Sequence, residues 1–198
     1  PSQSSSAAAE NGESPSRWRI HSPDSQTDAQ FDGGRELKDA SMSTAAIRFL
    51  QGVRVEFTTH EYEVDEAVGE GYGEAVAAAL GVQPEQVFKT LLARTDGSHA
   101  VAVIPVSERL STKALARVTG GKRATMADPA HAARLTGYLP GGISPFGQRR
   151  SLPTFVDATV EQFTTVFVSG GKRGLQVEVA PADLIRLTVE RIRRESPQ

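Results

Sequence analysis

The chain has 198 residues, of which 38% are hydrophobic, and a formal net charge of −2 at pH 7. It contains no cysteine, which excludes disulfides, thiolate metal sites and a catalytic cysteine. No stretch approaches the roughly 18 apolar residues of a membrane-spanning helix and no secretory signal pattern is visible, so we expect a cytoplasmic protein without a membrane partner.

Residues 1–41 differ in composition from the rest of the chain. They are rich in Ser, Asp, Glu, Gly and Pro and show almost no apolar periodicity, so they cannot bury enough apolar surface to offset the entropy lost on ordering. We expect a disordered N-terminal extension or leader here, followed by one domain over residues 42–198. That domain holds 18 basic and 17 acidic residues. Nucleic-acid-binding domains are usually far more basic, so any RNA contact must rely on local patches or on a partner.

The domain mixes helix and strand patterns along its length. Apolar spacing and start or stop signals predict helices over residues 43–50, 71–80, 107–120, 128–134 and 182–194. Ser111 and Thr112 are possible start signals inside the third of these. Alternating or short apolar runs predict strands over residues 53–57, 59–64, 87–94, 100–106, 122–126, 154–157, 164–168 and 175–179.

The irregular order of these elements does not fit a doubly wound sheet. The turn-forming residues 95–98 indicate a hairpin between two of the strands. We predict an α/β fold of the mixed, α+β-like kind. It is a single domain whose mixed, mostly antiparallel sheet of about seven strands is curved or barrel-like and is surrounded by helices.

Two glycine-rich segments, residues 137–150 and 169–174, each contain a glycine pair and a basic pair. Glycine lets the backbone come close to a ligand and tolerates positive φ, and consecutive N–H groups form concavities that bind anions. Plain turns explain the same glycines equally well. The spacing required for a phosphate-binding loop or a nucleophile elbow is missing.

Lys89 lies within an otherwise apolar strand. The pattern alone favours an outward-facing lysine, whereas the functional alternative is a cation at the mouth of a pocket, beside a phosphate or a carbonyl oxygen. Tyr62 and Tyr72 are equally open to two interpretations, as partly buried core residues or as faces on which a base stacks. The four histidines are scattered, so we expect no metal, no cofactor and no serine–histidine pair.

From Met42 to about Arg194 the sequence resembles the YbaK/EbsC family of trans-editing deacylases, relatives of the insertion domain of bacterial prolyl-tRNA synthetase. The matching stretches are residues 88–92, 126–128, 136–139, 141–145, 147–148 and 168–175. The resemblance implies an enzyme, a deacylase that removes cysteine from mischarged Cys-tRNA(Pro), and also from Cys-tRNA(Cys). It further implies aminoacyl-tRNA as substrate and prolyl-tRNA synthetase as a transient partner.

The resemblance also implies a mechanism in which the thiol of the bound cysteine attacks its own carbonyl and leaves as a cyclic thiolactone. The family's invariant lysine corresponds to Lys89, and with Gly141 and Ser169 it forms the expected catalytic set. Lys89 would neutralise either the terminal phosphate or the leaving oxygen. The expected substrate-binding positions are Tyr62, Tyr72, Gly142, Ile143, Ser144, Gly170 and Gln176. Relatives often have Asp at the position of Gln176, which puts a carboxylate role there in doubt.

Three basic pairs are candidate contacts for tRNA phosphates, although basic pairs in turns are often only solvated. These pairs are Lys122 with Arg123, Arg149 with Arg150, and Lys172 with Arg173. Three alternatives stay open at this point. The protein could hydrolyse another small aminoacyl-tRNA with a positioned water, bind tRNA ends without catalysis, or be an α/β domain whose glycine pairs are only turns.

Overall fold

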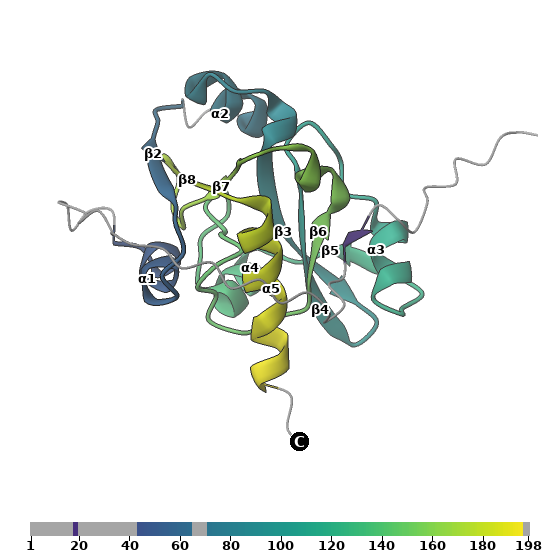
Figure 1. Ribbon diagram of the computed structural model, residues 1–198. Coiled ribbons are helices and arrows are strands. Elements are labelled where there is room, and N and C mark those ends of the chain that lie inside the picture. The colour runs from purple at the N-terminus through teal and green to yellow at the C-terminus, as the bar shows by residue number, and fades with distance from the viewer. Residues whose placement is uncertain (1–17, 20–42, 65–70, 196–198) are drawn as a thin grey trace, which may run out of the picture.

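The computed structural model describes residues 18–19, 43–64 and 71–195 (Figure 1). The helices are α1 (Ala45–Gly52), α2 (Tyr72–Leu80), α3 (Thr112–Val118), α4 (Pro129–Thr136) and α5 (Pro181–Glu195), with 3-10 turns η3 (Pro84–Gln86) and η4 (Ala158–Gln162). The strands are β1 (Trp18–Arg19), β2 (Thr58–Glu61), β3 (Val87–Thr95), β4 (Ser98–Pro105), β5 (Ala124–Met126), β6 (Thr154–Asp157), β7 (Val166–Ser169) and β8 (Leu175–Val179).

One mixed sheet organises the described residues. Its strand order is β1-β6-β4-β3-β7-β8-β2, with β5 paired to β3 outside this path. The β3–β7 and β4–β6 pairs are parallel, and the other pairs are antiparallel. The predicted mixed, mostly antiparallel sheet is therefore confirmed. It is an open sheet and not a closed barrel, because the path ends at β1 and β2.

The prediction of a strand over residues 53–57 is wrong. Val53 is the C-cap of α1, and its N–H donates to the carbonyl of Phe49, while the N–H of Arg54 donates to the carbonyl of Gln51. Arg54 has a φ of 56°, in the left-handed region, and the N–H of Val55 donates to the carbonyl of Leu50. The backbone N–H groups of residues 53–55 therefore cap the C-terminal end of α1 and do not pair with another strand.

The predicted helix over residues 107–120 is shorter than expected. It begins at Thr112, because the hydroxyl of Ser111 accepts the N–H of Ala114 and caps the first turn. Ser111 was recognisable as a start signal in the sequence. Residues 107–111 consequently form a loop between β4 and α3.

The expectation of a disordered segment over residues 1–41 lies outside the described residues, with one exception. Trp18 and Arg19 form β1, which pairs with Asp157 and Val156 of β6. This pairing gives β6 a second neighbour opposite β4.

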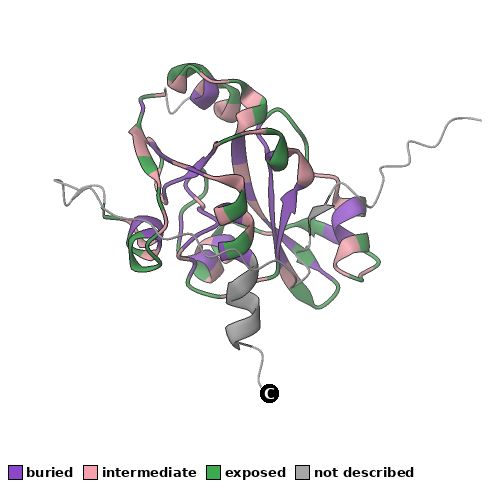
Figure 2. Cartoon of the chain, viewed as in Figure 1, coloured by how far each residue is buried: buried purple, intermediate pink, exposed green. Residues whose placement is uncertain are grey.

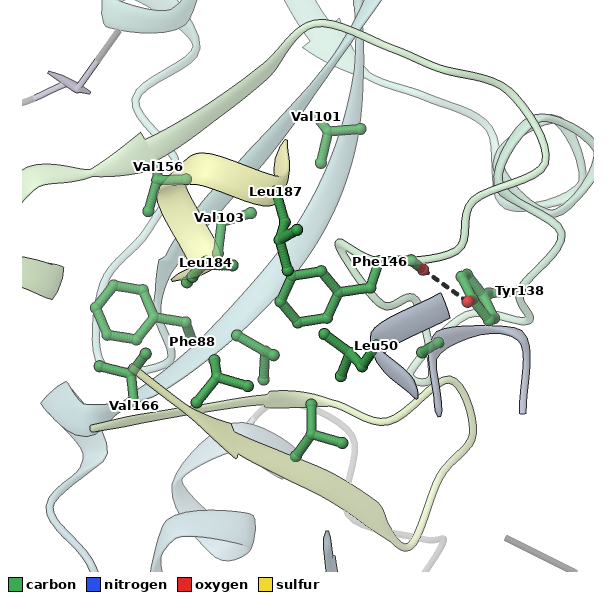
Figure 3. Packing of buried hydrophobic residues seen from close by; sticks show 14 of the residues in the cluster. Leu50, Phe88, Val101, Val103, Tyr138, Phe146, Val156, Val166, Leu184 and Leu187 are labelled. Atoms are coloured by element: carbon green, nitrogen blue, oxygen red, sulfur yellow. Dashed lines mark hydrogen bonds between the residues drawn. The ribbon is translucent and has the colours of Figure 1, made fainter. Parts of the chain in front are cut away.

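Apolar side chains are buried on both faces of the sheet, so the central strands lie inside the molecule (Figure 2). On one face, Leu92 and Val103 pack with α1 and α5, and Phe146 fills the space between these helices (Figure 3). On the other face, Ala93 and its neighbours pack under α3. A separate cluster from α2, β3 and β7 also lies away from α1 and α5.

We predict that Leu184→Ala lowers the free energy of unfolding by about 2–5 kcal/mol, because Leu184 joins α5 to the core and is 0% exposed. Leu139 is 76% exposed, and Leu139→Ala is the matched control, with an expected change within about 0.5 kcal/mol. Denaturant unfolding of both variants measures the difference. Equal losses would mean that α5 does not pack on the sheet in this way.

Candidate active site

A cleft of about 450 Å³ opens between α2, the first half of β3 and the loop that follows β4. Residues from the 141–143 segment, β7 and β8 complete its wall. Five of the predicted site residues besides Lys89 line it: Tyr72, Gly141, Ile143, Ser169 and Gln176. Segments far apart in sequence therefore converge on one site.

Strand alternation explains why the polar side chains share a face of the sheet. β3 and β7 pair in parallel with Val87 opposite Phe167, and both of these residues pack in the cluster under α2. Side chains two residues further along each strand point to the same side. Lys89 and Ser169 therefore emerge beside each other.

Gln176 joins this face from β8. It lies opposite Ser169 in the antiparallel β7–β8 pair, and residues directly opposite each other share a face. Its neighbours Leu175 and Val177 point the other way, into the main core. The floor of the cleft therefore has an ammonium, a hydroxyl and a carboxamide from three adjacent strands.

Lys89 is half-buried, and its Nζ donates to the carbonyl of Val106 at 3.1 Å. Burial lowers its pKa below the ordinary value of 10.5 by removing water from the ammonium. The Glu74 and Glu108 carboxylates oppose this change, while the Arg109 guanidinium adds to it. Lys89 is thus a positioned, partly desolvated cation at the cleft wall and not a freely solvated surface lysine.

A chain of hydrogen bonds connects the phenols to Gln176. The hydroxyls of Tyr62 and Tyr72 are 3.1 Å apart, and Gln176 Nε2 donates to Tyr62 Oη at 3.5 Å. Burial, followed by the bond to Tyr72, raises the pKa of Tyr62 to about 12, so the phenol is neutral near pH 7. Gln176 Oε1 is a buried acceptor without a hydrogen-bond partner among the described residues.

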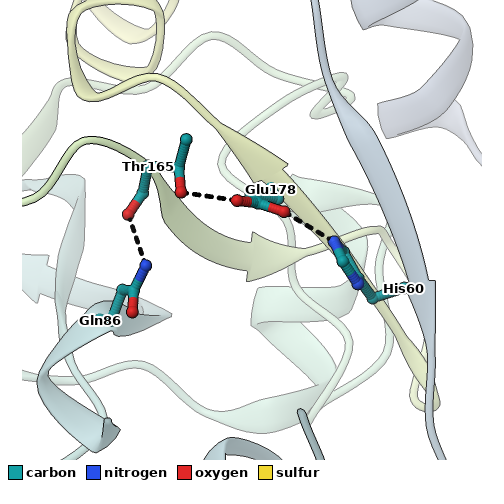
Figure 4. A network of polar contacts seen from close by, with 4 residues as sticks. All are labelled: His60, Gln86, Thr165 and Glu178. Atoms are coloured by element: carbon teal, nitrogen blue, oxygen red, sulfur yellow. Dashed lines mark hydrogen bonds and ion pairs between the residues drawn. The ribbon is translucent and has the colours of Figure 1, made fainter. Parts of the chain in front are cut away.

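The edge strand β2, which leads to Tyr62, is fixed by a polar network (Figure 4). His60 Nε2 lies 2.8 Å from Glu178 Oε2, and the hydroxyl of Thr165 donates to the other carboxylate oxygen at 2.6 Å. Gln86 Nε2 donates to the carbonyl of Thr165 at 2.9 Å. β2 is therefore attached to both β8 and η3, and the position of Tyr62 follows from this attachment.

The two glycine-rich segments meet at the rim of the cleft. A Cβ on Gly141, whose φ is +83°, would lie 2.5 Å from Arg173 Nε, and a Cβ on Gly142 would lie 2.9 Å from Lys172 Cα. The Arg173 guanidinium carbon lies 5.1 Å from the centre of the Tyr72 ring. The contact between the segments needs the missing Cβ atoms, so these glycines do more than form turns.

Besides Tyr62, three predicted substrate-binding residues lie outside the cleft lining. Ser144 is fully buried, where its hydroxyl accepts the N–H of Phe146 and its carbonyl accepts from Gln148. The N–H of Gly170 donates to the carbonyl of Leu175, and its carbonyl accepts from the hydroxyl of Thr44. Gly142 is used in the contact with Lys172. All three shape the segments that carry Gly141 and Ser169.

The predicted phosphate contacts are dispersed over the surface. Lys122 and Arg123 donate their backbone N–H groups to Asp96, just past the end of β3, which is roughly 20 Å along the strand from Lys89. Arg149 and Arg150 are exposed, and their N–H groups bond to the carbonyls at the end of α4. Among the described contacts of these pairs, those of Arg173 are with residues that line the cleft, Gly141 and Tyr72.

Sequence reasoning missed several charged residues of the cleft. Glu74, Glu108 and Arg109 all line it. The last two were assigned to a helix, and the Ser111 cap was the signal that could have placed them in a loop.

In the part of the chain that the structure describes, no group of three or more His, Asp or Glu residues could hold a metal ion. Nor does any described helix have the length and apolar character to cross a membrane.

Residues 71–187 match the sequence model of the aminoacyl-tRNA editing domain. The chain belongs to this family. Over 154 residues it is 34% identical to the "Putative Cys-tRNA(Pro)/Cys-tRNA(Cys) deacylase EbsC" of Enterococcus faecalis, covering 76% of this chain and 92% of the relative. It is 30% identical over 147 residues to the "Multifunctional Ser/Thr-tRNA deacylase ProXp-y" of Escherichia coli, covering 72% and 84%.

A crystal structure described as "a putative trans-editing enzyme for prolyl tRNA synthetase" superposes with a TM-score of 0.64 and 23% identity, covering 74% of this chain and 92% of that one. This similarity shows a shared fold. The predicted resemblance to the YbaK/EbsC family is confirmed, and with it the enzyme class: an aminoacyl-tRNA deacylase of the editing type, with aminoacyl-tRNA as substrate.

We predict that Gly142→Ala destabilises the fold by about 1–3 kcal/mol and lowers deacylation, because the added Cβ collides with the backbone of Lys172 and separates the two segments. Gly52→Ala is the control, since a Cβ there meets nothing within 4 Å. Thermal unfolding and a deacylation assay on both variants provide the comparison. If Gly142→Ala behaves like Gly52→Ala, the two segments are not in tight contact.

Proposed function

We propose that this protein removes cysteine from mischarged Cys-tRNA(Pro), and by the same chemistry from Cys-tRNA(Cys), by letting the substrate thiol cleave its own ester. The observation that supports this most is the composition of the cleft. Its described lining contains no histidine and no cysteine, and the hydroxyl of Ser169 accepts the N–H of Gly171 at 3.2 Å. Among the described residues, no histidine, carboxylate or amine is hydrogen-bonded to that hydroxyl, and Lys89 Nζ donates to Val106 instead. A nucleophile from the substrate therefore suits the site better than one from the protein.

The reaction exchanges one acyl bond for another. The cysteine sulfur bonds to the carbonyl carbon, the ester bond to the ribose oxygen breaks, and the thiol proton ends on that oxygen. The products are a cyclic thiolactone and uncharged tRNA. Holding the thiol against the carbonyl can contribute as much as ~7–11 kcal/mol in ideal intramolecular systems. A rigid cleft can therefore be effective without a catalytic nucleophile of its own.

The residues of the cleft have separate roles in this reaction. The Lys89 ammonium faces the bound ester and provides positive charge for the oxygen atoms around it. The Ser169 hydroxyl and the backbone of Gly141 orient the aminoacyl group. Gln176 Oε1, which is buried without a partner, accepts a hydrogen bond from the substrate ammonium, and the bond from Gln176 Nε2 to Tyr62 holds the carboxamide in place.

A synthetase partner is consistent with the charge distribution. The chain has a net charge of −2, and one of its three predicted basic pairs lies at the cleft. Such a surface gives little non-specific affinity for a polyanion. Prolyl-tRNA synthetase that has just released its mischarged product would provide the selection of tRNA that this domain does not make alone.

A second candidate function is hydrolysis of Ser-tRNA or Thr-tRNA by a positioned water molecule. The observation in its favour is the 30% identity to a relative named for Ser/Thr-tRNA deacylation. The two functions differ in the origin of the nucleophile, and so they can be separated by substrates that differ at the β-position.

We predict that Cys-tRNA(Pro) is deacylated about 100-fold faster, or more, than Ser-tRNA(Pro) and S-methylcysteinyl-tRNA(Pro), because only a free thiol can attack. The measurement is the loss of label from a panel of aminoacyl-tRNAs, which includes Ala-tRNA and Thr-tRNA. Equal rates for Cys-tRNA and its S-methyl derivative would exclude thiol attack and favour a positioned water. Binding without turnover of any substrate would favour a non-catalytic module.

We predict that Lys89→Ala reduces kcat/KM for Cys-tRNA(Pro) by about 100-fold or more, the size of effect seen when one preorganised oxyanion donor is lost. Lys113, an exposed residue of α3, provides the control variant Lys113→Ala, which should retain wild-type kinetics. Activity of Lys89→Ala within a few-fold of wild type would remove the lysine from the reaction.

A further inference from the structure

We propose that Arg109 holds the phosphate of the terminal nucleotide, and that Lys89 is thereby reserved for the ester oxygen. This inference rests on the proposed function, since it needs a nucleotide ester in the cleft. It assigns two cations of one cleft to two different oxygens of one substrate.

Arg109 has the position and the freedom that a phosphate contact requires. It lies on the loop between β4 and α3, lines the cleft and is exposed. Among the described residues it makes no hydrogen bond and no ion pair. Its guanidinium is close enough to Lys89 for the two charges to repel each other. An exposed planar fork that lines a cleft suits bidentate binding of a phosphate.

Lys89 is less suited to the same task. Its side chain is half-buried on β3, and its Nζ already donates a hydrogen bond to the carbonyl of Val106. It lies beside Ser169 on the floor, among the residues that face the aminoacyl group. In an aminoacyl nucleotide, the ester oxygen and the 5′-phosphate are separated by one ribose. A cation on the floor and a second at the mouth match these two ends.

The acidic residues of the cleft define what Arg109 can bind. Glu74 and Glu108 line the cleft together with Lys89 and Arg109, so the formal charges of these four residues cancel. A polyanion gains little from such a surface as a whole. A single phosphate held by short, directed hydrogen bonds does gain, and the effect should depend on the guanidinium geometry as well as on its charge.

The test compares two small substrates, the 3′-O-cysteinyl esters of adenosine and of adenosine 5′-phosphate, with the uncatalysed reaction subtracted. For the wild-type protein we expect kcat/KM to be about tenfold or more higher for the phosphorylated ester, as for one hydrogen bond to a charged group. Arg109→Ala should reduce this ratio to about one by raising KM for the phosphorylated ester. Arg109→Lys should restore part of it.

Lys89→Ala should slow both esters and retain the wild-type ratio. Arg94→Ala, at an exposed position in the other half of β3, is the control and should change neither rate nor ratio. A ratio that survives in Arg109→Ala, or that disappears in Lys89→Ala, overturns the assignment. Failure of the wild type to deacylate any Cys-tRNA would instead contradict the proposed function itself.

A binding measurement makes the test independent of turnover. Adenosine 5′-phosphate should inhibit deacylation of Cys-tRNA(Pro) more strongly than adenosine does, and Arg109→Ala should remove this difference. Equal inhibition of the wild type by the two compounds, or no inhibition by either, would count against a phosphate site at Arg109.

Discussion

The site depends on the register between β3 and β7. These strands pair in parallel with Val87 opposite Phe167 and Phe88 opposite Val168. This register brings Lys89 next to Ser169, and the β7–β8 pair then adds Gln176. A slip of one residue would turn every side chain of β3 to the other face. Lys89 would enter the apolar core and Phe88 would leave it, so the burial of Phe88 and the position of the ammonium are fixed by the same hydrogen bonds.

Rigidity around this register comes from contacts between the segments that surround the cleft. The His60–Glu178–Thr165 network attaches the edge strand β2 to β8, and the backbone N–H of Tyr62 donates to the carbonyl of Gly174 at 3.1 Å. The segment of Gly141 and Gly142 packs against Lys172 and Arg173 without intervening Cβ atoms. A site that works by orientation needs such support, because an error of about 1 Å in position can cost on the order of 100-fold in rate.

The sequence allowed some parts of this structure to be predicted and not others. The strands Thr154–Asp157 and Leu175–Val179 have the predicted bounds, because short apolar runs between turn residues have few alternatives. The segment 53–57 alternates like a strand, but the N–H groups of Val53 and Val55 donate to carbonyls at the end of α1 and are not available for strand pairing.

The candidate site was predictable to a similar extent. Lys89 and Gln176 were identified by resemblance, and alternation alone describes Lys89 as a residue facing away from the main core, which it is. What alternation cannot reveal is that α2 covers this face and turns it into a cleft. Arg109 was missed for a related reason, since its role depends on a loop whose course is set by the Ser111 cap and by packing between distant elements.

The charges around Lys89 explain how a half-buried lysine can act in an editing enzyme. Desolvation favours the neutral amine, and Arg109 adds to this effect, whereas Glu74 and Glu108 favour the ammonium. The carboxylates therefore oppose the lowering of the Lys89 pKa that burial causes. In the proposed function they would also limit the attraction for the rest of the tRNA. An enzyme that must act on a rare mischarged product among many correct ones benefits from this arrangement, because strong binding to every tRNA would occupy the site without chemistry. Under the proposed function, selectivity would reside in the reaction of the bound thiol and in the partner that delivers the tRNA, and the cleft itself would need only modest affinity.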